Sequence, residues 1–342
     1  MSYRYIGNKA RIVPILLEHV SQHVPEGGVV ADLMCGTASV SEALRTKGFK
    51  VIASDIMTYS THHARVRLLL DEAPSFNGLG CFSYDDVHDS LNSLPSEEGL
   101  FYREYSPEGS PNNGESPRQY FSAENASRID SISSQISSWH DQGKISDLEN
   151  SLLRHDLVLA ANKVANIAGT YGHYRSKWSN GSARVLKLKP AEFVWGYPTD
   201  HVVMQGPVEH VSGKVSADLC YLDPPYMKRQ YAANYHIIET IARGDDPEAV
   251  GVSGLRPWRD QYSDFCSKVK IRDAFRDVFK RIDCKQFLIS YSEDALLPEE
   301  EMLSLFEEFG EVSLSKFPNN RFKSNTGGAG GVVDEYLFYV KT

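Results

Sequence analysis

Residues 27–56 read GGVVADLMCGTASVSEALRTKGFKVIASDI. A short apolar run ends at Leu33, small residues form a turn around Gly36, and apolar residues then recur at helical spacing before a second apolar run ends in Asp55. This order of strand, turn, helix, strand and acid is typical of a nucleotide-binding βαβ unit, whose acid suits a pair of ribose hydroxyls. An ordinary βαβ crossover reads similarly, so the stretch predicts a parallel α/β sheet and leaves the nucleotide site open.

Apolar runs with strand character return after residue 200. They are HVVMQG (201–206), ADLCYL (217–222), KQFLISYS (285–292), EVSLSKF (311–317) and EYLFYV (335–340). Helix-like segments separate most of these runs, and the last pair reads as an antiparallel hairpin at the edge of an otherwise parallel sheet. Ligands of such sheets bind outside the carboxyl ends of the strands, where we expect Asp55 and Asp223.

The middle of the chain has a different composition. Residues 97–125 are rich in Pro, Gly, Ser and Asn, as in a long loop, and residues 122–142 and 145–169 then carry apolar side chains at helical spacing. We interpret them as two helices of an inserted subdomain. The predicted organisation is a first core part at 1–85, an inserted region at 86–200 and a second core part at 201–342.

The charge distribution favours a nucleic-acid partner although the formal net charge is −9. No acid occurs between Leu157 and Ala191, and this stretch holds several basic residues. They are Lys163, Arg175, Lys177, Arg184, Lys187 and Lys189. A second acid-free stretch holds Lys316, Arg321 and Lys323. Since phosphate contacts need only local positive potential, an acidic protein can bind DNA through such surfaces, and the alternative is a solvated charged face.

Aromatic and basic residues interleave between glycines in residues 169–189, GTYGHYRSKWSNGSARVLKLK. Flexible backbone, stacking rings and cations suit a grip on DNA, while a tyrosine-rich loop packed on the core is the alternative. The candidates for DNA contacts in this stretch are Tyr171, Tyr174, Arg175 and Lys177.

Cysteine and histidine usage argues against disulfides and metals. The five cysteines are scattered without a CxxC pair, which predicts reduced thiols in a cytoplasm. The histidines are dispersed, and His62-His63 lacks metal-ligand spacing, so we expect no metal site. No apolar stretch approaches the roughly 20 residues of a membrane span, and the N-terminal segment lacks a cleavable apolar core. We expect a cytoplasmic protein that does not cross a membrane.

The most specific chemistry lies in YLDPPYMKRQ, residues 221–230. An apolar strand would deliver Asp223 to the sheet edge, and two prolines stiffen the backbone after it because each fixes φ and removes an N–H. The Asp223 carboxylate and the Pro224 carbonyl then form two acceptors beside the aromatic face of Tyr226. This arrangement suits an exocyclic amino group on a flat base. Lys228 and Arg229 come shortly after Tyr226 and are candidates for phosphate contacts.

Together these motifs resemble the Dam-like DNA adenine N6-methyltransferases, the alpha group of the D12 class. DPPY matches the catalytic motif of that family. RYIGNKARI (4–12) resembles its N-terminal motif, with Tyr5 and Lys9 at matching positions. ADLMCGTASVSEAL (31–44) resembles its cofactor turn, although Ala38 stands where glycine is usual. NIAGTYGHYRSKW (166–178) and RFKSNTGGAG (321–330) also resemble family segments, so the resemblance runs almost end to end.

The resemblance implies a Rossmann-like methyltransferase sheet with a mostly helical target-recognition insertion. It implies S-adenosylmethionine as the methyl donor and double-stranded DNA as the substrate, with a restriction enzyme as a possible partner. The expected donor-binding residues are Tyr5, Lys9, Asp32, Gly36, Asp55 and Asp223. The expected catalytic residues are Asp223, Pro224 and Tyr226. The expected DNA contacts are Tyr171, Tyr174, Arg175, Lys177, Lys228, Arg229, Arg321 and Lys323.

We therefore expect a site-specific DNA adenine N6-methyltransferase that acts on a flipped base. The same acceptor pair fits any exocyclic amine, so methylation of cytosine N4 in DNA, or of adenine in RNA, is an alternative. A catalytically idle subunit that binds DNA or the donor is the alternative from another class.

Overall fold

The computed structural model describes Lys9 and residues 12–80, 83–113, 115–320 and 332–342. Their contacts divide the chain into two compact units. The sheet unit comprises the described residues of Gly7–Asp71, Val194–Gln230 and Gln261–Thr342. The helical unit comprises those of Glu72–Phe193 and Tyr231–Asp260.

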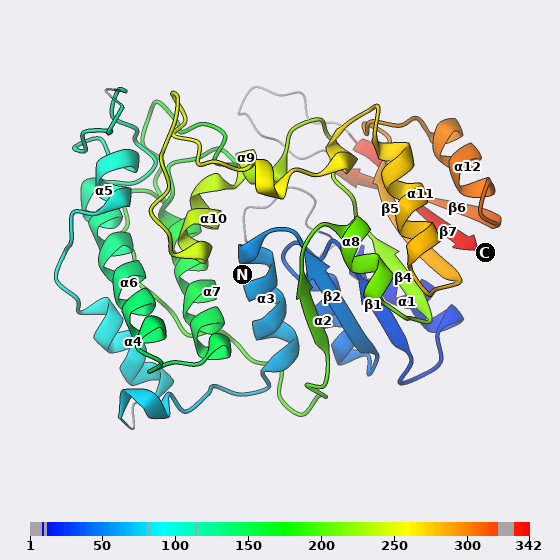
Figure 1. Ribbon diagram of the computed structural model, residues 1–342, viewed down its shortest axis with the longest axis horizontal. Coiled ribbons are helices and arrows are strands. Elements are labelled where there is room, and N and C mark those ends of the chain that lie inside the picture. Colours follow the sequence, from blue (N-terminus) through cyan, green and yellow to red (C-terminus); the bar gives the residue numbers. More distant parts are fainter. Residues whose placement is uncertain (1–8, 10–11, 81–82, 114, 321–331) are drawn as a thin grey trace. The chain divides into compact units, whose positions relative to one another are not determined.

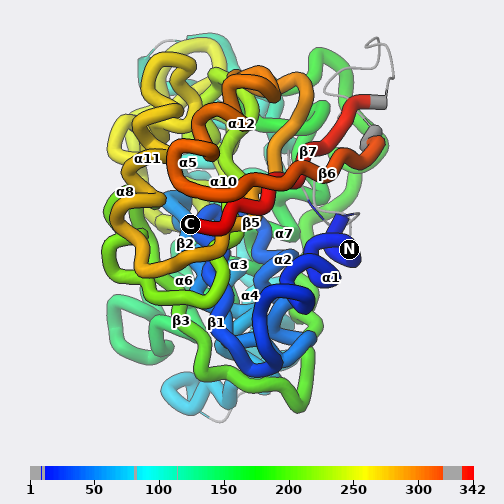
Figure 2. The backbone as a smooth tube through the Cα atoms, turned by 90° about the vertical axis from the view of Figure 1, so that its right-hand side faces the viewer, coloured from blue at the N-terminus to red at the C-terminus, as the bar shows by residue number. Residues whose placement is uncertain are grey.

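The sheet unit is built on seven strands in the order β3-β2-β1-β4-β5-β7-β6 (Figure 1). The strands are β1 Val29–Asp32, β2 Lys50–Asp55, β3 Val202–Gln205, β4 Leu219–Leu222, β5 Gln286–Ser292, β6 Glu311–Asn320 and β7 Val332–Lys341. The strands from β3 to β5 in this order pair in parallel, whereas β7 pairs antiparallel with both β5 and β6. The predicted parallel sheet with a C-terminal antiparallel hairpin is confirmed, and Figure 2 shows β6 and β7 as neighbouring runs of the tube.

Helices cover both faces of this sheet, because the central strands are apolar on both sides. Alternate residues of β4 belong to two different cores: Leu219 and Tyr221 face one, and Cys220 and Leu222 face the other. The first core is completed by α1 Val13–His23, α2 Ser39–Thr46 and α3 Thr58–Leu69. The second is completed by α8 Val208–Val211, α11 Ile271–Arg281 and α12 Glu299–Glu307.

The helical unit holds the two long helices that the sequence predicts. They are α6 Ala123–Asp141 and α7 Asp147–Val164, which pack against each other. Ser146 begins α7 with a capping box: its hydroxyl accepts from the amide of Glu149, and the Glu149 carboxylate accepts from the amide of Ser146. The remaining α-helices of this unit are α4 Tyr84–Asn92, α5 Leu100–Tyr105, α9 Tyr231–Asn234 and α10 His236–Arg243. Of the short 3-10 helices, η1 Asn77–Leu79 belongs to this unit, η2 Ser212–Lys214 and η4 Asp264–Cys266 belong to the sheet unit, and η3 Arg259–Gln261 crosses the boundary in the sequence.

Segment 231–260 joins the helical unit through buried polar side chains that bind its backbone. Arg154 of α7 donates to the carbonyl of Ile241 at 3.0 Å, and Arg118 donates to the carbonyl of Gly251 at 2.9 Å. The predicted insertion, 86–200, did not include this segment or residues 72–85. The assignment of this unit to target recognition stays a prediction.

The cysteines of the described residues form no disulfide bond. Cys35, Cys220, Cys266 and Cys284 are free thiols, and Cys81 lies outside the described residues. Within the described ranges, no group of three or more His, Cys, Asp or Glu side chains is arranged to hold a metal ion. No helix in the same part of the chain has the length and apolar character needed to cross a membrane.

Candidate active site

Three acids lie at one edge of the sheet because three neighbouring parallel strands end there. Asp32 ends β1, Asp55 ends β2, and Asp223 directly follows β4. The register places Asp32 beside Tyr221 of β4 and Ala53 of β2, so the carboxyl ends of these strands are level. The expectation that Asp55 and Asp223 lie at the same edge is confirmed. All four residues of β4 are buried, so this strand fixes the backbone from which Asp223 projects.

Asp223 belongs to a cluster of four side chains, which we call the Asp223 cluster: Lys9, Asp223, Tyr226 and Glu335. The Lys9 ammonium lies 3.2 Å from Asp223 Oδ1 and also contacts the Tyr226 hydroxyl and Glu335 Oε1. The Tyr226 hydroxyl lies 2.9 Å from Asp223 Oδ1 and 2.6 Å from Glu335 Oε1, so its single proton can be donated to either acid. The cluster therefore joins the end of β4 to β7.

The side chains of the Asp223 cluster are shielded from water to different degrees. Lys9 is 6% exposed and Glu335 is 5% exposed, whereas Asp223 is 16% exposed. Burying a carboxylate is costly unless it is paired and hydrogen-bonded, and here two carboxylates share one ammonium and one hydroxyl. Asp223 is thus the acid of the cluster that remains most open to a ligand.

Burial shifts the protonation equilibria of the edge acids. Burial raises the pKa of Asp223 to about 6, the ammonium of Lys9 opposes this shift, and the charge of Glu335 adds to it. Burial raises the pKa of Asp32 to about 7, which the hydrogen bond from Ser41 opposes. An acid with such a pKa is largely ionised just above neutral pH yet accepts a proton readily.

The turn after β1 is tied to the end of β2 through Asp55. Its carboxylate accepts from the amide of Gly36 at 2.9 Å and from the amide of Met57 at 2.8 Å. Gly36 has φ +52° and Ala38 has φ +57°, so both lie in the left-handed region. For alanine this conformation costs about 1 kcal/mol, which explains why glycine is usual at that position in similar turns.

The same edge fits the donor that the resemblance implies. The buried Asp32 Oδ1 has no hydrogen-bond partner within the described part of the chain, so an acceptor is available for a cationic or hydroxyl-bearing ligand. Asp55 ends β2 at the same edge, where the resemblance places the ribose contact. Lys9 differs, because its three N–H donors are matched by three oxygen atoms of the Asp223 cluster. This geometry favours Lys9 as a support for Asp223 over direct contact with the donor.

The predicted DNA contacts of the helical unit divide by exposure. Arg175 and Lys177 are exposed and Tyr174 is half-buried, in keeping with a contact role. Tyr171, however, is fully buried: its amide donates to Asn234, and its carbonyl accepts from Tyr120. The prediction of Tyr171 as a DNA contact is wrong, because this side chain is part of the interior of the helical unit. The alternative of a tyrosine packed on the core holds at this position.

The remaining predicted site residues lie in the sheet unit or outside the described ranges. Lys228 and Arg229 are exposed in the sheet unit, shortly after the DPPY segment, and Pro224 is buried. Tyr5, Arg321 and Lys323 lie outside the described residues.

Glu335 is the member of the Asp223 cluster that sequence reasoning missed. It begins the run EYLFYV, and β7 brings it opposite Ser292 at the carboxyl end of β5. The signal was an acid at the start of an otherwise apolar strand, since such an acid must find a partner when it is buried. Its partner could not be identified without the register of β5 and β7.

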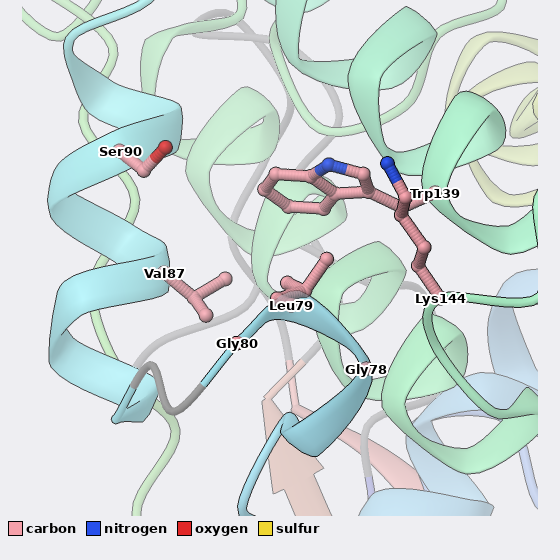
Figure 3. A pocket seen from close by; sticks show the side chains of 7 residues that line it. All are labelled: Gly78, Leu79, Gly80, Val87, Ser90, Trp139 and Lys144. Carbon is pink, nitrogen blue, oxygen red and sulfur yellow. The ribbon is translucent and has the colours of Figure 1, made fainter.

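The helical unit contains a pocket of about 430 Å³. It is lined by Gly78, Leu79, Gly80, Val87, Ser90, Trp139 and Lys144. Figure 3 shows the Trp139 indole and the side chains of Leu79 and Val87 around the same space. The lining includes neither an acid nor a histidine, so it lacks the acceptors that proton transfer needs, and the Asp223 cluster is the better candidate for chemistry.

A DPPY segment at the end of a central parallel strand, beside a nucleotide-type turn, defines a class of methyltransferase. The family model of the D12 class N6 adenine-specific DNA methyltransferases matches residues 5–305. The chain belongs to this family, and the resemblance inferred from its motifs is confirmed.

Individual relatives agree with this assignment. The chain is 31% identical to the type II methyltransferase M.FokI of Planomicrobium okeanokoites, over 99% of this chain and 52% of that protein. It is 32% identical to M.NlaIII of Neisseria lactamica, over 94% of this chain and 92% of that protein. It is 28% identical to M.CviAII of Paramecium bursaria Chlorella virus 1, over 98% of this chain and 97% of that protein. The chain spans about half the length of M.FokI and nearly the full length of the other two.

Proposed function

We propose that the protein is a site-specific DNA adenine N6-methyltransferase of a restriction-modification system. It would transfer a methyl group from S-adenosylmethionine to the amino group of an adenine in double-stranded DNA. The observation that carries this proposal is Asp223 at the end of β4, held by Lys9, Tyr226 and Glu335 in a chain of the D12 family. The curated relatives are named as type II methyltransferases or modification methylases, which supports the same reaction class.

S-adenosylmethionine, when bound, supplies a methyl group on a positively charged sulfur. The acid-rich strand edge suits such a cation, and Asp32, Gly36 and Asp55 are the described residues that would hold the donor. Tyr5 is proposed for the same role on the resemblance alone. Lys9 would act mainly through Asp223, because its donors already face the cluster.

The adenine amino group must leave the duplex to reach this edge. Flipping costs a few kcal/mol in lost stacking and pairing. We propose that Tyr226 returns part of this cost by stacking on the base. The Lys9 ammonium contacts the hydroxyl of this ring and lies 4.5 Å from the ring centroid.

Asp223 and the Pro224 carbonyl would activate the amino nitrogen. Its lone pair is delocalised into the ring, and two hydrogen bonds from N6 to these acceptors favour a tetrahedral nitrogen with a localised lone pair. The donor would supply the methyl group to this nitrogen, and the electron pair of its sulfur–carbon bond would stay on sulfur. The methylated nitrogen then releases one proton, which the Asp223 carboxylate can accept. Most of the acceleration would come from positioning and electrostatics.

Each unit has exposed cations that would bind DNA. Arg175 and Lys177 of the helical unit, and Lys228 and Arg229 of the sheet unit, are suited to phosphate contacts. Recognition of the target sequence is proposed for the helical unit. A cytoplasmic location and a cognate restriction enzyme follow from the proposed system.

Identification of the methylated nucleoside tests the proposed function. The purified protein is incubated with isotope-labelled donor and either mixed-sequence DNA or RNA, and the nucleic acid is digested and analysed by mass spectrometry. We expect labelled N6-methyldeoxyadenosine from DNA alone. Labelled N4-methyldeoxycytidine, or label in RNA adenosine, would support the alternative substrates, and absence of transfer would support an idle subunit. Sequencing DNA from expressing cells with modified-base detection would then give the target sequence.

A further inference from the structure

The Asp223 cluster contains one acid more than the proposed methyl transfer uses. Glu335 lies outside the family match at 5–305, and it neither accepts a proton from the substrate amine nor holds the donor in the proposed reaction. Its side chain is 5% exposed, its Oε1 contacts the Lys9 ammonium, and the same oxygen lies 2.6 Å from the Tyr226 hydroxyl. A second buried carboxylate beside a catalytic acid is costly unless it is paired, and Glu335 shares the partners of Asp223, Lys9 and the Tyr226 hydroxyl.

Without Glu335 the cluster would have a different charge balance. Lys9 would then pair with Asp223 alone, and a buried carboxylate paired one-to-one with an ammonium is a weak proton acceptor. The Tyr226 hydroxyl would also have only one carboxylate to bond. In the structure Glu335 shares both groups with Asp223. Glu335 therefore reduces the hold of Lys9 on Asp223 and gives the Tyr226 proton a second acceptor.

The contacts of Asp223 within the cluster involve one of its two carboxylate oxygens. Both Lys9 and Tyr226 contact Oδ1 of Asp223. This arrangement orients the carboxylate through one oxygen and leaves Oδ2 for the substrate amine. Glu335 stabilises it, because Glu335 Oε1 contacts both the Lys9 ammonium and the Tyr226 hydroxyl.

We propose that Glu335 is a positioning residue for methyl transfer, which divides the charge of Lys9 and orients the Tyr226 hydroxyl so that Asp223 presents Oδ2 to the substrate amine as a proton acceptor. This inference rests on the proposed function, and it adds a role for the C-terminal hairpin in the chemistry. Glu335 itself acts through Lys9 and Tyr226 and touches neither the base nor the donor.

The test compares Glu335→Gln and Glu335→Asp with the wild type and with a matched surface control. The control is Glu311→Gln, which removes an exposed carboxylate at the start of β6 in the same unit. Single-turnover methyl transfer to DNA is measured as a function of pH. Affinity for S-adenosylhomocysteine by calorimetry and the unfolding temperature are measured alongside.

The Gln variant should change both the rate and its pH dependence. The active form of Asp223 is the carboxylate, so the wild-type rate falls as pH drops through about 6, the raised pKa of this acid. Loss of the Glu335 charge lowers the pKa of Asp223. The fall of the rate at acidic pH, which we call the acidic limb of the pH profile, therefore moves to lower pH. The plateau rate should fall by about 100-fold, because the acceptor loses its orientation. Affinity for S-adenosylhomocysteine should stay unchanged, which a merely unfolded or distorted edge would not give.

The Asp variant separates charge from orientation. It keeps the negative charge but is one methylene shorter, so the acidic limb should stay in place while the plateau rate falls. Glu311→Gln should match the wild type in every measurement. If Glu335→Gln fails to fold, a wild-type plateau in Glu335→Asp would by itself overturn the inference.

The two proposals fail in different ways. If the wild type is active and Glu335→Gln has the same rate and the same acidic limb, the role of Glu335 is overturned and the proposed function stands. A wild-type protein that transfers no methyl group to DNA would overturn the proposed function, and the inference with it.

Discussion

Each unit of the protein buries charged side chains, and the two units use them differently. In the helical unit Arg118 and Glu104 form an ion pair at 2.9 Å with side chains 0% and 2% exposed. The remaining donors of Arg118 go to backbone carbonyls, including those of Gly251 and Val252. In the sheet unit, the Asp223 cluster has two acids for one lysine, and Asp223 is 16% exposed.

The difference separates structural from chemical use of buried charge. Arg118 uses its donors to join two segments of one unit, so its interactions are complete without a ligand. The Asp223 cluster has surplus negative charge and an acid with a raised pKa, which structural stability alone does not favour. We expect mutations in the first pair to affect folding and mutations in the second to affect reaction rate.

The largest effect is expected from Asp223→Ala. This change removes the acceptor of the substrate amine, so methyl transfer should fall by at least about 1000-fold. The unfolding temperature should change little, because the residue is partly exposed and its neighbours are held by Glu335. Labelled methyl transfer and thermal unfolding are measured on the same preparation. Normal turnover in this variant would refute the assignment of Asp223.

Arg118→Met tests the structural role of the buried ion pair in the helical unit. Glu104 would stay buried without its strongest partner, so the free energy of unfolding should fall by about 3 kcal/mol. The rate of methyl transfer per folded molecule should be retained below the unfolding transition. Urea unfolding and an active-site titration check this prediction, and a variant that is fully stable yet inactive would mean that the pair serves the chemistry.

Surface cations of the helical unit should affect binding and leave folding unchanged. In the double variant Arg175→Ala and Lys177→Ala, the dependence of log affinity on log salt should lose about 2 units of slope, one for each lost phosphate contact. Lys268→Ala, an exposed lysine of the sheet unit outside both basic stretches, is the control.

Tyr171→Phe should leave DNA affinity and target choice unchanged, since this side chain is buried. A large loss of affinity in Tyr171→Phe would show that the loop opens to expose it.

Ser146→Ala should give the smallest effect. It removes the hydroxyl half of the capping box of α7, which should cost about 1 kcal/mol of unfolding free energy. The rate of methyl transfer should stay the same. Thermal unfolding measures the loss, and an unchanged stability would mean that packing alone holds the start of this helix.

Sequence reasoning succeeded where local pattern determines the structure. The strands read correctly because their apolar runs are short and bounded by turn residues, and Asp55 and Asp223 could be placed at one edge because parallel strands end together. The roles of Lys9 and Glu335 could not be derived in this way. They depend on side chains more than 100 residues apart in the chain, and Glu335 reaches the end of β4 because β5 pairs with both β4 and β7.

The helical unit was harder to read for a related reason. Residues 231–260 come after the catalytic motif and looked like part of the core, but Arg118 and Arg154 bind their backbone into the other unit. The burial of Tyr171 results from the same association, since its amide bonds Asn234 within that segment. Alternating aromatic and basic residues predicted a surface loop, yet tertiary packing decided which aromatics face outward.

The role of Asp223 and Pro224 as paired acceptors is best tested by a crystal structure of the protein with S-adenosylhomocysteine and duplex DNA that carries the target site. We predict an extruded adenine whose N6 lies about 3 Å from both Asp223 Oδ2 and the Pro224 carbonyl, with its ring against Tyr226. An extruded base whose amino group contacts neither acceptor, or a complex in which the base stays stacked in the helix while methylation proceeds, would contradict this role.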